Sequence, residues 1–316
     1  MKKTVSLIMI IAMLLLLCAC TNTENKKDGI SIVCTAFPQY DYIKNIIGSD
    51  DGLTLLLDDG ADLHSYEPTA QDIIKIGSAD LFVFVGGASD VWVEGALHSA
   101  NNPELQTIAL MDIVDTYEQE YVAGMQHESG EHIHAHNGDH SEEDEHIWLS
   151  IRNAAEITDY LCGIISKIDP DNSSLYRVNA DKYIAELNAL DAEYTAIAEN
   201  SARKIILLAD RFPFRYLVED YGITYFAAFA GCSSESEASF DTMAFLIDKT
   251  NELQLPYILT IEGSDGSIAK MICEETDAES LTLDSCQSVS SADIEQGASY
   301  LGIMKSNLEI LREALN

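Results

Sequence analysis

The chain has 316 residues, of which 47% are apolar, and it carries 53 Asp and Glu against 18 Lys and Arg, a formal net charge of −35. This length and apolar content are enough for one large domain or two ordinary ones with buried cores. The negative charge argues against a nucleic-acid partner, because phosphate contacts need Lys and Arg, and against attachment to anionic lipid through a basic patch.

The first twenty residues have the features of a bacterial export signal. A basic start precedes an apolar run from Val5 to Leu17, which is too short to span a bilayer comfortably. The run ends in Leu-Cys-Ala-Cys, which resembles a lipobox with Cys20 as the lipidated residue. The alternatives are an ordinary secretory peptide and an uncleaved anchor. We predict a signal peptide at residues 1–19, a lipid anchor to the cell membrane on Cys20, and a tether at residues 20–29 that leads to an extracytoplasmic domain.

Five cysteines lie beyond Cys20, the predicted lipidation site, so they cannot all pair within the chain. No Cys-x-x-Cys pair is present, which argues against a zinc ribbon and against a thioredoxin-like site. A disulfide between Cys273 and Cys286 and buried free thiols are both compatible with the sequence.

From residue 30 onward, short β-rich apolar runs alternate with helical periodicity. Strands are expected at Ser31–Phe37, Leu53–Asp58, Leu81–Gly86 and Thr107–Met111. Helices are expected at Tyr40–Ile47, Glu67–Ala79 and Val91–Ser99, with Pro68 in the first turn of the second. This alternation predicts a parallel sheet with helices on its faces, in an N-terminal lobe that spans residues 30–152.

A second series of the same kind begins near residue 203 and predicts a C-terminal lobe over residues 203–316. Its strands are expected at Lys204–Asp210, Thr224–Phe229, Tyr257–Glu262 and Ser280–Asp284, and its helices at Phe214–Tyr221, Ser239–Leu253, Ser267–Glu275 and Ala292–Ala314. Residues 153–202 between the lobes are helical, and Ser173–Asn200 has the apolar spacing of one long helix. At 1.5 Å per residue this helix would be about 42 Å long and would act as a stiff connector. The fold class is therefore α/β, with two parallel-sheet lobes joined by a long rigid α-helix.

The histidines are concentrated in one segment. Six of the eight lie between His127 and His146, together with seven carboxylates, and no Lys or Arg occurs from residue 76 to residue 151. Imidazole and carboxylate ligands suit divalent transition metals, zinc above all. The segment has no hydrophobic periodicity, so we predict a mobile His-rich loop at residues 124–145 that collects ions; the alternative is a solvated acidic loop. Its auxiliary metal-binding residues are expected to be His127, His132, His134, His136 and His140.

Two histidines lie where regular structure is expected. His64 falls between a strand end and a helix start, the position where open α/β sheets bind ligands. His146 is the last residue of the His-rich series and directly precedes regular structure, so it should be held more rigidly than the loop histidines. His98 lies in a predicted helix and is interpreted as structural.

Several motifs together resemble those of the zinc/manganese solute-binding lipoproteins of bacterial ABC importers. They are Gly-Ala-Asp-x-His-x-Tyr-Glu-Pro-Thr at 60–69, the His-rich loop, His-Ile-Trp-Leu-Ser at 146–150, Phe-x-Tyr-Leu at 214–217, Gly-Cys-Ser-Ser-Glu at 231–235 and Leu-Asp-Ser at 283–285. The resemblance implies two α/β lobes joined by a rigid helix, with one metal ion in the cleft between them. It also implies an ABC permease and an ATPase as partners.

By resemblance, the metal ligands are His64 and His146 from the first lobe and Asp284 from the second. The family has a His or Glu at the position occupied here by Arg211, and a guanidinium cannot ligate a metal. Asp210 is the candidate replacement in the predicted ligand set. The alternatives are Glu235 or Glu237, a shell completed by water, or an Arg211–carboxylate pair in place of the metal.

The predicted function is capture of Zn²⁺ and its delivery to an ABC import permease, without catalysis. Manganese is the alternative ion, although the His-rich loop favours zinc. A metal-binding surface adhesin or buffer is the alternative from another class. A secreted zinc hydrolase is disfavoured, because the segment His-Glu-Ser-Gly-Glu-His at 127–132 fits neither H-E-x-x-H nor its inverted form.

Overall fold

The computed structural model describes residues 29–58, 63–126, 143–233, 237–287 and 289–316. Residues 31–316 form one compact unit. The predicted signal peptide, Cys20 and the five auxiliary loop histidines lie outside the described residues. Within the part that the structure describes, no helix combines the length and the apolar character needed to cross a membrane.

The N-terminal lobe is built on a four-stranded parallel sheet of order β2-β1-β3-β4. Its strands are β1 (Ile32–Cys34), β2 (Leu53–Leu55), β3 (Leu81–Phe84) and β4 (Gln106–Ala109). Its helices are α2 (Phe37–Ile47), α3 (Ala70–Ser78) and α4 (Val93–Ala100), with single 3₁₀ turns η1 (Leu63–Ser65), η2 (Ala88–Asp90) and η3 (Leu110–Asp112). All the strands and helices expected in this lobe are present.

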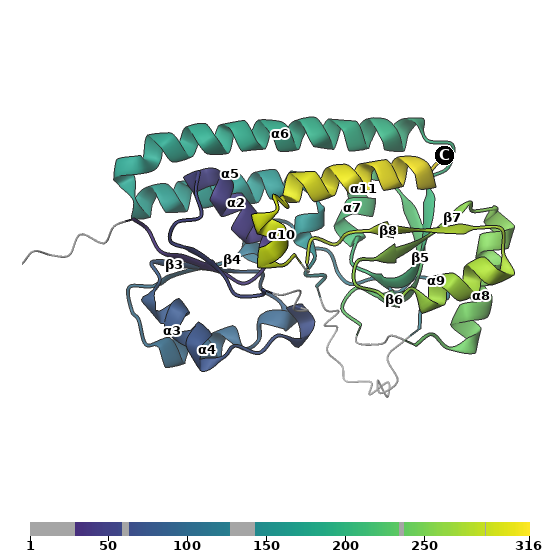
Figure 1. The fold of residues 1–316 in the computed structure, drawn as a ribbon, viewed down its shortest axis with the longest axis horizontal. Helices are drawn as coiled ribbons and strands as arrows, with labels where there is room; N and C mark the ends of the chain where they lie inside the picture. The colour runs from purple at the N-terminus through teal and green to yellow at the C-terminus, as the bar shows by residue number, and fades with distance from the viewer. Residues whose placement is uncertain (1–28, 59–62, 127–142, 234–236, 288) are drawn as a thin grey trace, which may run out of the picture. The chain divides into compact units, whose positions relative to one another are not determined.

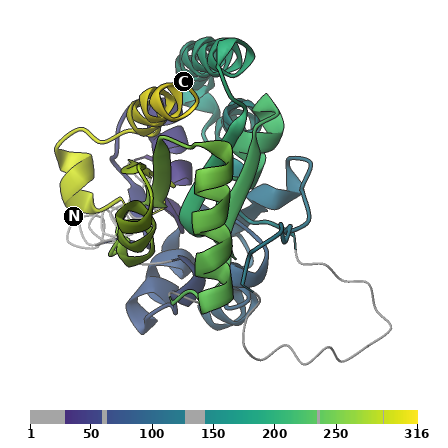
Figure 2. The ribbon, with the colours of Figure 1, turned by 90° about the vertical axis from the view of Figure 1, so that its right-hand side faces the viewer.

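The C-terminal lobe repeats the plan in the parallel order β6-β5-β7-β8. Its strands are β5 (Ile205–Phe212), β6 (Thr224–Ala230), β7 (Tyr257–Ile261) and β8 (Glu279–Leu283). Its helices are α7 (Arg215–Tyr221), α8 (Phe240–Leu253), α9 (Ser267–Glu275), α10 (Ser291–Glu295) and α11 (Tyr300–Ala314). Figure 2, which faces this lobe, shows α8 in front of its sheet.

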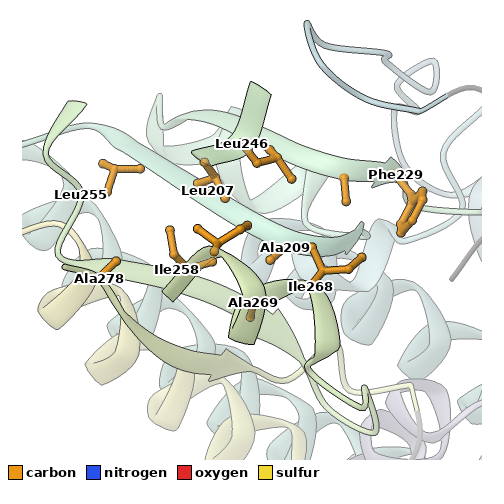
Figure 3. Close-up of a cluster of buried hydrophobic side chains, with 11 residues drawn as sticks. Leu207, Ala209, Phe229, Leu246, Leu255, Ile258, Ile268, Ala269 and Ala278 are labelled. Carbon is orange, nitrogen blue, oxygen red and sulfur yellow. The ribbon is translucent and has the colours of Figure 1, made fainter. Parts of the chain in front are cut away.

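Helices cover this second sheet and bury an apolar core. Leu207 of β5 and Ile258 of β7 pack with Leu246 of α8 and with Ile268 and Ile272 of α9, and Figure 3 shows the cluster. All five side chains are at most 5% exposed. The continuous apolar runs of these strands follow from this arrangement, because a parallel sheet is buried on both faces.

Several predicted boundaries are wrong, and two of them have clear local causes. The α3 helix begins at Ala70, two residues after Pro68, because Thr69 caps it: its Oγ1 accepts the backbone N–H of Asp72 at 3.2 Å, and the Asp72 carboxylate accepts the N–H of Thr69 at 3.0 Å. The helix expected at Ala292–Ala314 is divided into α10 and α11. Gly297, at φ 97°, follows the end of α10 and turns the chain, and Ser299 caps α11.

The connector consists of α5 (Ile151–Ile168), a short turn η5 (Pro170–Asn172) and α6 (Ser173–Asn200), whose 28 residues match the predicted long helix. Figure 1 shows α6 running alongside α5 and α11. It packs on α2 of the N-terminal lobe and on α7 and α11 of the C-terminal lobe. Tyr183 donates a hydrogen bond to Asp41 of α2 at 2.9 Å, and Tyr194 donates to the carbonyl oxygen of Met304 in α11 at 2.6 Å. One helix is thus hydrogen-bonded to both lobes.

Asp41 gives this connection a testable pH dependence. The side chain is 4% exposed, and burial raises the pKa of its carboxyl to about 6 although Tyr183 donates to it. The folded protein therefore holds this proton more tightly than the unfolded chain, in which the pKa of Asp is about 4. The resulting stabilisation is complete below about pH 4 and is lost as the pH rises through about 6.

Between about pH 4.5 and 7.5, we expect the free energy of unfolding of the metal-free parent to fall by about 2 kcal/mol more than that of Asp41→Asn, because the amide does not titrate. Urea unfolding at the two pH values measures the difference. Asp248→Asn, at an exposed position on α8, is the matched control. An equal pH dependence in parent and Asp41→Asn would contradict the assignment.

Candidate metal centre

The structure brings together His64, His146 and Cys232. One ligand atom from each, a ring nitrogen or the Sγ, lies within 4.8 Å of the other two. The ring centroids of the two histidines are 5.4 Å apart. Within the described residues, no other group of three or more His, Cys, Asp or Glu side chains meets this condition. The group therefore includes both histidines expected from the sequence, and also a cysteine that was not predicted as a ligand.

His64 lies in η1, between β2 and α3, and the neighbouring turn η2 orients its ring. The Nδ1 atom is 2.8 Å from the hydroxyl oxygen of Ser89. Ser89 is itself fixed, because its backbone N–H donates to the Glu145 carboxylate at 2.9 Å. In the tautomer that donates from Nδ1 to Ser89, the coordinating lone pair of His64 is on Nε2.

His146 lies just before the turn η4 (Ile147–Leu149), and Asp144 holds its ring. One oxygen of Asp144 accepts the backbone N–H of His146 at 2.9 Å and is 3.0 Å from the Nδ1 atom of the same residue. The histidine is 1% exposed. Its Nε2 atom is buried and has no hydrogen-bond partner among the described residues. A carboxylate on Nδ1 and an unpartnered Nε2 are the arrangement of a histidine prepared to bind a metal.

Cys232 follows the carboxyl end of β6, and Gly231 allows it to approach His146. A Cβ atom at position 231 would lie 2.8 Å from the carbonyl oxygen of Phe212 and 3.2 Å from Cε1 of His146. Only glycine fits this gap without displacing a neighbour. The chain can therefore pass directly against the imidazole, and the next side chain is the thiol.

A small cavity lies beside His146, with a volume of about 30 Å³. Since a water molecule needs about 10–15 Å³ measured in this way, the space is large enough for one. The cavity is lined by His146, Arg211, Pro213, Gly231, Ile261, Glu262, Ser285 and Gln287. The buried imidazole therefore faces a polar space to which the C-terminal lobe contributes a guanidinium and a carboxylate.

Glu262 is held in this cavity by Ser285. Its carboxylate accepts the backbone N–H of Ser285 at 2.8 Å and also the hydroxyl of that residue. Burial, and then the nearby charge of Asp284, raise the pKa of Glu262 to about 7. The Nε1 of Trp148 donates to the carbonyl oxygen of Ser285 at 2.8 Å, so the segments that carry His146 and Ser285 are joined directly.

The other predicted ligands lie outside the group of three. Asp284 accepts the backbone N–H of Cys286 at 2.7 Å, and Asp210 accepts the backbone N–H of Arg211 at 2.8 Å. Glu235 lies outside the described residues.

Cys232 was not predicted as a ligand from the sequence. Two signals pointed to it: it follows the end of a predicted strand, in the Gly-Cys-Ser-Ser-Glu motif, and it is one of an odd number of cysteines. None of the five cysteines beyond Cys20 forms a disulfide in the structure, so Cys273 and Cys286 are not paired.

Residues 32–314 match the family described as zinc-uptake complex component A, periplasmic. The chain belongs to this family. It is 30% identical over 320 residues to the high-affinity zinc uptake system protein ZnuA of Bacillus subtilis, covering 99% of this chain and 98% of that protein. It is 29% identical over 311 residues to the zinc-binding lipoprotein AdcA of Streptococcus pneumoniae, covering 98% of this chain but only 61% of AdcA.

Solved structures confirm the fold. The Zn(II)-bound ZnuA-like domain of AdcA from S. pneumoniae superposes with a TM-score of 0.72 at 26% identity, covering 90% of this chain and 98% of that one. The metal-dependent lipoprotein YcdH from B. subtilis gives a TM-score of 0.74 at 28% identity, covering 91% of this chain and 99% of that one. The predicted class of two α/β lobes with parallel sheets is therefore correct.

The tight space at Gly231 can be tested without metal. We expect Gly231→Ala to lower the free energy of unfolding by about 1–3 kcal/mol, because the added methyl group forces a backbone or ring displacement. The control is Gly163→Ala, in the exposed interior of α5, where a Cβ meets nothing within 4 Å. This change should be neutral or stabilising by up to about 1 kcal/mol. Chemical denaturation of both variants measures the effect, and a neutral Gly231→Ala would show that the gap is not tight.

Proposed function

We propose that the protein captures Zn²⁺ between its two lobes and delivers it to an ABC import permease and its ATPase. The observation that carries the proposal is the group of His64, His146 and Cys232, whose ligand atoms lie within 4.8 Å of one another. His64 and His146 are the ligands from the N-terminal half. Membership of the zinc-uptake family and the likeness to the Zn(II)-bound domain of AdcA support the same function.

The chemistry of the group supports zinc. Zinc is bound in proteins by His, Cys and carboxylate ligands, most often in tetrahedral geometry. Manganese prefers carboxylate, carbonyl and water oxygens, and neither Asp284 nor Asp210 is among the three residues. The carboxylate of Asp144 on His146 supplies the supporting hydrogen bond that raises the basicity of a metal-bound imidazole.

The rest of the chain serves the same function in this proposal. The lipid on Cys20 holds the protein at the outer face of the membrane. The His-rich segment, with the excess acidic charge around it, raises the local concentration of cations. Because α6 is hydrogen-bonded to both lobes, uptake and release involve small adjustments of the lobes. No catalytic step is part of the proposal.

Replacing either histidine should remove the tight site. We expect His64→Ala and His146→Ala each to weaken zinc binding at least about 100-fold. The loss of a residue that only supports a ligand costs up to about 100-fold, and the loss of the ligand itself should cost at least as much. His98→Ala, on α4 and outside the group, should leave the affinity unchanged. Isothermal titration of the metal-free protein with Zn²⁺, in competition with a chelator, measures all three. Retention of tight binding in His64→Ala or His146→Ala would refute the proposal.

The role of the His-rich segment can be separated from that of the tight site. A deletion must stop at residue 142, because Asp144 holds the ring of His146 and Glu145 accepts the N–H of Ser89. We expect replacement of residues 127–142 by a short Gly-Ser linker to remove weaker ions while leaving one tight zinc. Counting bound zinc by titration tests this; loss of the tight ion would contradict a collecting role.

A further inference from the structure

We infer that Cys232 is the metal ligand that the C-terminal lobe supplies, in place of a side chain at position 211, and that its thiolate makes the site selective for thiophilic ions such as zinc over manganese. This inference rests on the proposed function and adds to it the identity of one ligand and the cause of the selectivity.

The first support is the unsuitability of Arg211. The residue lies near the end of β5 and lines the cavity beside His146, but a guanidinium has no lone pair to offer a metal. A ligand from the C-terminal lobe must therefore come from another residue. A thiolate offers a lone pair and also a negative charge, which a neutral histidine does not.

The second support is the register of the C-terminal sheet. Arg211 pairs with Phe229 and Phe212 pairs with Ala230 in the parallel ladder of β5 and β6. Neighbouring strands lie about 4.8 Å apart, so the carboxyl end of β6 brings its following residues to the place that position 211 borders. Gly231 permits contact with the His146 ring, and Cys232 comes next. The ligand of the C-terminal lobe is therefore supplied from the end of β6 and not from β5.

The third support is distance. Tetrahedral coordination with bonds of about 2.0–2.3 Å places ligand atoms about 3.3–3.6 Å apart. The three ligand atoms already lie within 4.8 Å of one another, so an adjustment of about 1 Å would complete the geometry. A water molecule is the usual fourth ligand beside three protein ligands in an open zinc site.

Selectivity follows from the donor atom. Thiolate is a soft ligand that favours zinc and cadmium, while manganese favours oxygen. Cys232→Asp keeps the negative charge and replaces sulfur with oxygen. The ratio of zinc affinity to manganese affinity should therefore fall by a larger factor in Cys232→Asp than the zinc affinity itself.

The test uses Co²⁺ as a spectroscopic probe on the metal-free protein under reducing conditions. The parent should show an intense near-ultraviolet sulfur-to-cobalt charge-transfer band. Cys232→Ser should lose this band and weaken zinc binding at least about 100-fold. Cys273→Ser removes a thiol outside the group and should change neither. Circular dichroism of each variant checks that it is folded.

A rescue variant distinguishes a ligand from a structural thiol. In the parent, Arg211→His should change the zinc affinity little, because Cys232 already supplies the ligand of the C-terminal lobe. In Cys232→Ser, the same substitution should restore most of the lost affinity, because the new imidazole takes the place of the thiolate. A merely structural role for the cysteine predicts no rescue, and that result would overturn the inference.

The two proposals can fail separately. Tight zinc binding by the parent without a charge-transfer band, or with a band that survives in Cys232→Ser, would overturn the thiolate ligand and leave zinc capture standing. Absence of tight zinc binding in the parent would overturn both.

Discussion

The hydrogen bond between Asp144 and His146 is the interaction on which the candidate site depends. It fixes the ring of a histidine that is 1% exposed and directs its Nε2 atom away from the carboxylate. Without it, a buried imidazole could rotate or change tautomer, and the separation from His64 and Cys232 would no longer be defined. The backbone N–H of His146 is bound by the same carboxylate oxygen, so the support and the ligand form one local unit.

This unit lies where the two lobes meet, and both sides restrict it. Gly231 of the C-terminal lobe passes against the ring, while Trp148, two residues along, donates to Ser285 at 2.8 Å. The hydroxyl of Tyr300 at the start of α11 donates to the carbonyl oxygen of Trp148 at 2.6 Å. Behind these contacts, α6 is hydrogen-bonded to α2 and α11. These contacts restrict how far the two lobes can move relative to each other around the candidate site.

Local patterns were sufficient for most of the fold. The alternation of apolar runs and amphipathic segments predicted all eight strands of the described sheets, and the spacing of apolar residues predicted α6 with its observed ends. Errors occurred where a capping side chain or a turn outweighs periodicity, as at Thr69 and Gly297. The first strand was predicted to reach Phe37, but Gln39 accepts the backbone N–H of Ala36 and starts α2 there.

The sequence by itself determined the two α/β lobes, the long helix and the pair His64 and His146, because these depend on periodicity and on motifs within single segments. Only the tertiary structure decided which residue of the C-terminal lobe comes within reach of the histidines. Asp210 and Asp284 are the last residues of two expected strands, yet each carboxylate accepts a nearby backbone N–H, while Cys232 lies in the group. The register between β5 and β6 and the absence of a side chain at Gly231 set that choice, and both are relations between segments distant in sequence.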